Sequence, residues 1–321
     1  MKNINIAYAT DKKQYILTLV SIFSVLKNSS PQSFYKFHIL NDNLCNKIKK
    51  SFKQVENKYK NCSIEFIQVD SNIFSEFPLS EWVTVPAWFR ILLPDLLPEA
   101  DKILYLDNDT IINNSIIEMY NTDLSEELLA GIEDCCKTQE KIRKLNMKSN
   151  IYINSGVLLI NAKKWRENKI FDKIKDFAIK NKNWIEFSDQ SCINKIIDEN
   201  KIALSPKYNL MENEWRNYQV EYTGNTLKDF KKALENPTII HYTGAKPNTP
   251  ESGHKFKKLW WKYAKETKEI KKIKIQYFFK SVYKMKDYIF SIKNKYINDK
   301  KYKIITILGF SLKYNTRNKI D

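Results

Sequence analysis

Lys102-Ile-Leu-Tyr-Leu-Asp107-Asn-Asp109-Thr110 is a short apolar run that ends in two carboxylates spaced two residues apart. The apolar part predicts a buried strand. In open α/β sheets, ligands bind beyond the carboxyl ends of the strands. Because residues i and i+2 of an extended chain point to the same side, Asp107 and Asp109 can face one point. This pattern favours a hard divalent cation held by oxygen ligands. A solvated turn that ends a strand is the alternative interpretation.

Outward from this run, strands and helices alternate. The pattern predicts strands at 3–9, 35–40, 63–69, 102–106, 154–161 and 238–242. It predicts helices at 11–26, 44–59, 88–93, 165–179 and 188–199. This order indicates an α/β fold with a mostly parallel central sheet and helices on both of its faces.

Length and composition limit the class of protein. The 321 residues can form one large α/β domain with an appendage, or two modest domains, and a hydrophobic content of 43% is ample for a core. No run is long and apolar enough to span a bilayer, and the N-terminus reads as a first strand without the apolar region of a signal peptide. The five cysteines lack C-x-x-C spacing, which indicates reduced thiols. We therefore expect a cytoplasmic protein.

The charge is concentrated at one end of the chain. The formal net charge is +17, and residues 255–321 hold 20 Lys and Arg against 5 Asp and Glu, a net of +15. Composition changes near 251–254, so we predict a body at 1–254 and a basic C-terminal segment at 255–321. The apolar residues of this segment recur at helical spacing, which predicts helices with Lys-rich opposite faces: Ile270, Ile273, Tyr277, Met285, Tyr288, Ile289 and Ile292.

A basic amphipathic helix is typical of a membrane-surface element. We therefore expect the C-terminal segment to place the protein at the inner face of the cytoplasmic membrane, where each lysine near anionic lipid contributes about 1 kcal/mol. A helical pair that packs on the body is the alternative. Nucleic acid is not expected as a partner, because no recognised module is present.

A second motif, His241-Tyr-Thr-Gly244-Ala-Lys246-Pro247, follows the short strand at 238–242. Imidazole suits Mn²⁺ and similar ions, and a lysine is a point charge suited to phosphate. Glycine permits close approach of the backbone. A structural histidine and an ordinary turn are the alternative. Together with the acidic run, one metal and one diphosphate account for both motifs.

Two weaker signals complete the set. Asp189 and Gln190 open a predicted helix, where an acidic residue is favoured by the helix dipole alone. Asn154 precedes Gly156 at the start of a strand, where a bulge or turn is the simpler interpretation.

These motifs occur in an order that resembles glycosyltransferase family 8, the group of LgtC-type galactosyltransferases, bacterial glucosyltransferases and glycogenin. The resemblance covers about residues 3 to 250. The matching stretches are Ile6-Ala-Tyr-Ala9-Thr-Asp11, Trp88-Phe-Arg90, Leu104-Tyr-Leu-Asp107-Asn-Asp109, Asn154-Ser-Gly-Val-Leu-Leu-Ile-Asn161, Asp189-Gln190 and the His241 motif. The resemblance implies a GT-A type nucleotide-diphospho-sugar transferase fold for residues 1–254. The basic tail predicted above to be helical follows this fold.

The resemblance also implies roles for individual residues. Asp107, Asp109 and His241 would hold Mn²⁺ or Mg²⁺. The residues implied to bind the UDP-sugar donor are Ala9, Asp11, Arg90, Asp107, Asn108, Gly244 and Lys246. Those implied to line the donor sugar, as candidate catalytic residues, are Asn154, Asp189 and Gln190.

The expected reaction is metal-dependent transfer of galactose or glucose to a cell-surface glycan or glycolipid with retention of anomeric configuration. Extra negative charge on the departing diphosphate would be stabilised by a cation and a lysine. Gln190 is implied to sit where a back-face group would act, but a carboxamide is a poor nucleophile, which favours front-face attack.

Two other functions remain open from the sequence. Asp107 and Asp109 also match the paired aspartates of the nucleophile motif of haloacid dehalogenase-type phosphatases, although no suitable acidic loop follows. The other is a non-catalytic protein that binds glycan or lipid.

Overall fold

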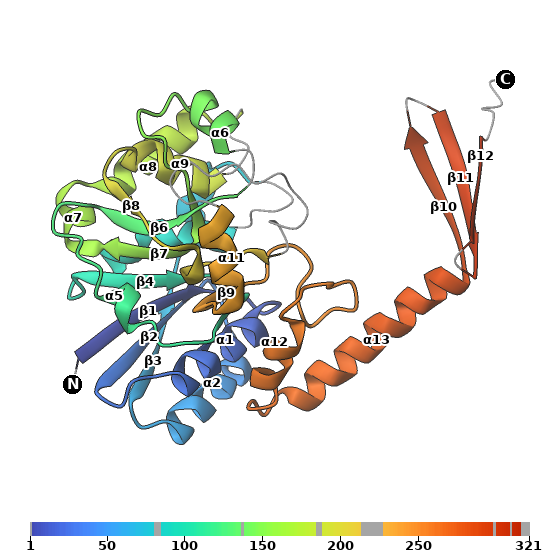
Figure 1. Cartoon of the computed structure of the whole chain (residues 1–321), viewed down its shortest axis with the longest axis horizontal. Coiled ribbons are helices and arrows are strands. Elements are labelled where there is room, and N and C mark those ends of the chain that lie inside the picture. Colours follow the sequence, from blue (N-terminus) through green and yellow to red (C-terminus); the bar gives the residue numbers. More distant parts are fainter. Residues whose placement is uncertain are drawn as a thin grey trace.

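The structure, a computed structural model, describes residues 2–79, 85–135, 138–183, 188–212, 227–297, 300–308 and 310–315. Its centre is a seven-stranded sheet with the order β3-β2-β1-β4-β7-β6-β8 (Figure 1). The strands are β1 (Lys2–Ala9), β2 (Ser33–Asn41), β3 (Cys62–Gln68), β4 (Lys102–Leu106), β6 (Leu129–Glu133), β7 (Ile153–Asn161) and β8 (Lys201–Ala203). β7 runs antiparallel to β4 and β6, and the other four pairings are parallel. The prediction of a mostly parallel sheet is confirmed.

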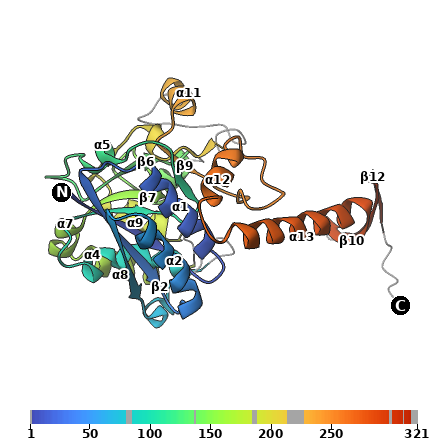
Figure 2. The ribbon, with the colours of Figure 1, turned by 90° about the horizontal axis from the view of Figure 1, so that it is seen from below.

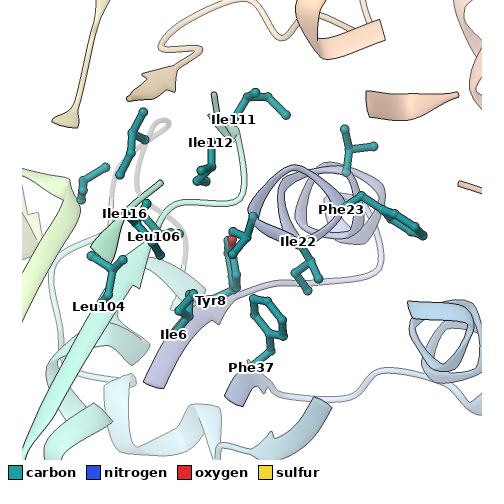
Figure 3. Close-up of a cluster of buried hydrophobic side chains, with 14 of the residues drawn as sticks. Ile6, Tyr8, Ile22, Phe23, Phe37, Leu104, Leu106, Ile111, Ile112 and Ile116 are labelled. Carbon is teal, nitrogen blue, oxygen red and sulfur yellow. The ribbon is translucent and has the colours of Figure 1, made fainter. Parts of the chain in front are cut away.

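Both faces of the sheet are covered, because alternate side chains of each strand enter different cores. Ile6 and Tyr8 of β1 enter one hydrophobic cluster, and Ala7 and Ala9 enter another. Figure 3 shows the first cluster, where β1, β2 and β4 pack against Phe23 and its neighbours. The first face is covered by α1 (Tyr15–Lys27), α2 (Asn46–Lys58) and α12 (Lys257–Ala264). The second is covered by α3 (Val85–Trp88), η2 (Phe89–Leu92), α4 (Leu93–Leu96), α7 (Ala162–Glu167), α8 (Ile170–Lys180) and α9 (Ser188–Ile197).

A second, two-stranded sheet decides the geometry of the site. Its first strand, β5 (Thr110–Ile112), directly follows the acidic run and is not predicted from the sequence. β5 pairs antiparallel with β9 (Ile239–His241), and the register sets Thr110 opposite His241. Two motifs about 130 residues apart are therefore joined by backbone hydrogen bonds.

Several boundaries differ from the predictions. The helix expected at 165–179 is two helices, α7 and α8, because Lys169 adopts a left-handed conformation with φ of 50°. The remaining elements are η1 (Ser71–Phe74), α5 (Ile117–Tyr120), α6 (Thr138–Lys144), η3 (Pro206–Tyr208) and α11 (Leu227–Glu235). Within the described ranges, none of the helices has the length and apolarity needed to cross a membrane.

The C-terminal segment leaves the body along a helix and ends in a sheet. α12 packs against α1 and contributes Trp260 and Tyr263 to the first core. α13 (Ile270–Ile289) then projects away from the body, as Figures 1 and 2 show. Beyond Ile289 the prediction of a helix is wrong. The chain forms an antiparallel sheet of β10 (Phe290–Ile297), β11 (Lys300–Ile307) and β12 (Phe310–Asn315), because apolar and polar residues alternate there with a period of two.

Candidate functional site

A cavity of about 870 Å³ lies beyond the carboxyl ends of β1, β4 and β9. This volume is in the range of sites for small organic ligands. Of the residues singled out in the sequence, the lining contains Ala9, Asp11, Arg90, Asp107, Asn108, Asp109, Gln190, His241, Gly244 and Lys246. The structure thus brings ten of the twelve candidate residues to one cavity.

The two carboxylates and the imidazole converge on one point. The Nε2 atom of His241 lies 3.3 Å from an oxygen of Asp109 and 3.8 Å from an oxygen of Asp107. One ligand atom from each of the three residues lies within 4.8 Å of the others. Two oxygens and one imidazole nitrogen at this spacing form a set that can hold a divalent cation.

Gly156 of β7 makes this convergence possible. Its carbonyl accepts a hydrogen bond from the backbone N–H of Asp107 at 2.7 Å. A Cβ at this position would lie 2.3 Å from Cε1 of His241 and 2.8 Å from an oxygen of Asp107. Both candidate ligands therefore pack against the bare Cα of a glycine, and any larger residue would displace them.

Asp109 lies in a strongly polar and buried environment. Burial alone would raise its pKa, but the adjacent Lys246 and His241 lower the pKa well below the usual range. Lys246 donates a hydrogen bond to one oxygen of Asp109. For His241, burial lowers the pKa, but Asp109 and Asp107 raise it, so that the net shift is upward. Asp109 is thus held as a carboxylate, ready to act as a ligand.

Arg90 joins the acidic run to the start of α9. Its guanidinium lies 3.1 Å from an oxygen of Asp107 and 3.3 Å from an oxygen of Asp189. It also donates to the carbonyl of Ser155 and stacks over the ring of Tyr105, 4.5 Å from the centroid. The Tyr105 hydroxyl donates to Asp107 at 2.7 Å. Because Arg90 and Asp189 are both buried, this ion pair is a structural element of the cavity wall.

Gln190 is held by hydrogen bonds on both ends of its carboxamide. Its oxygen accepts from Asn154 at 3.2 Å and from the backbone N–H of Ser155 at 3.0 Å. Its nitrogen donates to Asp134 at 2.6 Å, and Asp134 in turn pairs with the buried Lys141 at 2.9 Å. The side chain therefore has one orientation at the cavity.

Asn154 and Asp189, the two remaining candidates, lie one contact away from the cavity. Asn154 contacts Gln190, and Asp189 contacts Arg90. Burial raises the pKa of Asp189, Arg90 lowers it, and Asp107 raises it again, for a net upward shift. Asp11 accepts hydrogen bonds from the backbone of the two residues before α1, so it also has a local capping role.

Several residues that build the site carry no recognisable signal in the sequence. Tyr105 has no distinguishing signal within an apolar strand, and Lys141 and Asp134 belong to no recognised motif. Asn209 is fully buried and bonds to His241, but it follows η3 in a stretch without periodicity. Gly156 is the exception, since the Asn154-Ser-Gly156 sequence marks close approach of the backbone.

The chain is similar in sequence to known glycosyltransferases. The model of the family described as "Glycosyl transferase family 8" matches residues 5–248. General stress protein A of Bacillus subtilis (strain 168) is 25% identical over 251 residues, which span 76% of this chain and 87% of that protein. The lipopolysaccharide 1,2-glucosyltransferase of Escherichia coli is 28% identical over 251 residues, which span 75% of this chain and 71% of that protein.

A solved structure has the same architecture. The crystal structure of the galactosyltransferase LgtC in complex with donor and acceptor sugar analogs superimposes with a TM-score of 0.75 at 24% sequence identity. The match covers 83% of this chain and 96% of that chain. The likeness confirms the GT-A type fold expected from the sequence.

Proposed function

The chain belongs to glycosyl transferase family 8, and from this premise we propose that it transfers galactose or glucose from a UDP-sugar to a cell-surface glycan. The acceptor class that we propose is lipopolysaccharide, lipooligosaccharide or a capsule precursor, which agrees with the lipopolysaccharide glucosyltransferase among its relatives. The observation that carries the proposal is the convergence of Asp107, Asp109 and His241, with Lys246 beside them, at one cavity. Membership of this family excludes the alternative of a haloacid dehalogenase-type phosphatase.

Different residues of the cavity lining are suited to bind different parts of the donor. We propose that Ala9, Asp11 and Asn108 contact the nucleoside, since they lie at the end of β1 and the start of the acidic turn. Gly244 is suited to bind the diphosphate, because it adopts a φ of 71° that leaves its backbone open to close approach. Lys246 is the partly buried cation beside it, with 35% of its side chain accessible.

We propose that the sugar of the donor binds at the wall of the cavity that contains Gln190. Gln190 is the candidate that reaches the cavity surface, while Asn154 orients it and Asp189 orients Arg90. A carboxamide held by three neighbours presents a hydrogen-bonding group of fixed orientation to the sugar hydroxyls. It is a weak nucleophile, so we propose retention through front-face attack rather than through a covalent intermediate.

A divalent cation, Mn²⁺ or Mg²⁺, would neutralise the charge that develops on the departing diphosphate. Asp107, Asp109 and His241 are the residues that would hold it, and their mixed oxygen and nitrogen donors suit Mn²⁺. Lys246 adds a second positive charge on the same side. In this arrangement the acceptor hydroxyl gives its proton to the departing phosphate oxygen.

A panel of UDP-sugars tests the proposed activity. We expect UDP release from UDP-galactose or UDP-glucose that requires Mn²⁺ and disappears with a chelator. Release of inorganic phosphate from phosphate monoesters in the same assay, without release of UDP, would contradict the proposal.

Replacing Gly156 should damage the cation site without changing its ligands. A Cβ in Gly156→Ala would collide with both His241 and Asp107, so we expect Mn²⁺ affinity to fall by about 10- to 100-fold. Gly253→Ala is the matched control, because nothing lies within 4 Å of a Cβ added there. Isothermal titration with Mn²⁺ alone measures both variants. Equal affinities would contradict the proposed role of Gly156.

We propose that residues 1–254 carry catalysis, and that residues 255–321 meet an anionic membrane surface on the cytoplasmic side. The sheet of β10, β11 and β12 supplies the apolar part of this surface. Strand register places one set of side chains on the same face: Phe290, Ile292, Ile305, Ile307, Phe310, Leu312 and Tyr314. Phe310 is 81% exposed and Leu312 is 69% exposed. The opposite face carries Lys293, Ser311 and Lys313 among others.

Charge favours lipid over a second copy of the chain as the partner of this face. The segment carries a net charge of +15, so two copies would repel each other, whereas anionic headgroups would be attracted. The sheet also stands at the far end of α13 from the body (Figure 2), where it can reach a surface without obstruction by the catalytic domain.

Binding to lipid vesicles tests which face of this sheet contacts the membrane. We expect Leu312→Asp to lower partition onto vesicles of phosphatidylglycerol and phosphatidylcholine by about 10- to 100-fold, since burial of a leucine contributes about 1.5–3 kcal/mol. Ser311→Asp adds the same charge on the opposite face of β12 and serves as the control. Equal losses in both variants would contradict insertion of the apolar face.

A further inference from the structure

A chain of side-chain amides leads from the backbone of β7 to the imidazole of His241. Asn209 lies between them, with its oxygen 3.0 Å from Nδ1 of His241 and its nitrogen 2.9 Å from the oxygen of Asn154. Asn209 is fully buried and His241 is 5% exposed. Water therefore has little access to compete for these bonds.

The direction of every bond in this chain follows from two backbone groups, because a backbone N–H can only donate. The N–H of Gly156 lies 3.0 Å from one end of the Asn154 carboxamide, so that end is the oxygen. The N–H of Ser155 lies 3.0 Å from one end of the Gln190 carboxamide, which is likewise the oxygen. The Asn154 nitrogen then donates to Gln190, and the two assignments agree.

The hydrogen bond to Asn154 fixes the orientation of the Asn209 carboxamide. Since the Asn154 oxygen accepts, the atom of Asn209 that faces it must be the nitrogen. The Asn209 oxygen consequently faces Nδ1 of His241. A carboxamide oxygen has no proton to give, so Nδ1 must carry one.

We propose that Asn209 is a positioning residue that fixes the proton of neutral His241 on Nδ1 and leaves the lone pair of Nε2 directed at Asp107 and Asp109. Nε2 is the nitrogen that lies 3.3 Å and 3.8 Å from these carboxylates. The inference rests on the proposed cation site, because a lone pair at Nε2 is what a cation requires of its ligand. The other tautomer would place a proton where the cation is bound.

Backbone pairing holds Asn209 in place. The N–H of Leu210 donates to the carbonyl of Ile239 at 2.8 Å, and the N–H of His241 donates to the carbonyl of Leu210 at 3.1 Å. These bonds fix the residue beside β9. The side chain of Asn209 is thus set by the same strand that carries His241.

Imidazole ¹⁵N spectroscopy tests the inference on the metal-free protein. The chain has three histidines, so the spectrum is simple, and His241→Gln assigns the relevant signals. In a buffer alkaline enough for a neutral ring, we expect His241 of the wild-type protein to be protonated on Nδ1. A wild-type ring protonated on Nε2 would overturn the proposal, whatever the variants do.

Two variants of Asn209 make the test sharper. Asn209→Leu removes the acceptor, and we expect the Nε2-protonated form to become populated and Mn²⁺ affinity to fall by about 10- to 100-fold. Asn209→Asp loses the donor toward Asn154 but keeps an acceptor toward Nδ1, and we expect it to retain the wild-type tautomer. An unchanged tautomer in Asn209→Leu would overturn the proposal. Failure of the wild-type protein to bind Mn²⁺ would contradict the proposed function instead, since the tautomer is read without metal.

Discussion

Asp109→Asn is expected to reduce Mn²⁺-dependent turnover of the UDP-sugar by about 100- to 1000-fold, the range seen when one preorganised electrostatic group is removed from an active site. Asp109 contacts two basic groups of the site, His241 at 3.3 Å and Lys246. Asparagine has almost the same shape, but it lacks the charge that holds a divalent cation. The loss should therefore be chemical and not structural.

Two measurements accompany this variant. Circular dichroism should show an unchanged fold, and Mn²⁺ titration should show a parallel loss of metal binding. Asp176→Asn is the matched control, because this exposed aspartate lies on α8, within the fold but outside the cavity lining. Full turnover in Asp109→Asn would count against the metal assignment.

Arg90→Met should have the largest effect on stability. Arg90 is buried between Asp107 and Asp189, so its removal leaves the carboxylate of Asp189 without its cation in a water-poor environment. Breaking a buried ion pair in this way costs about 3–5 kcal/mol. Urea unfolding measures the loss, and Arg143→Met on the exposed face of α6 should change the free energy of unfolding by less than about 0.5 kcal/mol.

A double variant shows whether the pairing is the cause. Asp189→Asn removes the charge that Arg90 neutralises, so Arg90→Met combined with Asp189→Asn should be less destabilised than the sum of the single variants. Strict additivity would mean that Arg90 acts through packing on Tyr105 and not through the ion pair.

The strands that position the site could be predicted because their patterns are local. The run at 102–106 coincides with β4, and the expected strand at 154–161 begins one residue late. Apolar runs flanked by polar turns carry this information within a few residues. The first helix starts later than expected, since Asp11 caps a turn before α1 instead of joining the helix.

Residues whose role depends on distant contacts could not be predicted. In the sequence, Asn209 is one asparagine among many, and its role is visible only once β9 brings His241 beside it. β5 is too short to give a periodic signal, yet its pairing with β9 joins the two motifs. At the C-terminus, lysines and apolar residues are interleaved on both sides of Ile289, so the composition alone predicts helix beyond the residue at which α13 ends.

The proposed reaction depends on a cation that links the protein to the diphosphate of the donor. Calorimetric titration of UDP into the wild-type protein, with and without Mn²⁺, measures this link directly. We expect UDP to bind at least about tenfold more tightly with Mn²⁺, and this enhancement to vanish in His241→Ala. Equal UDP affinity with and without Mn²⁺ in the wild-type protein would contradict the account.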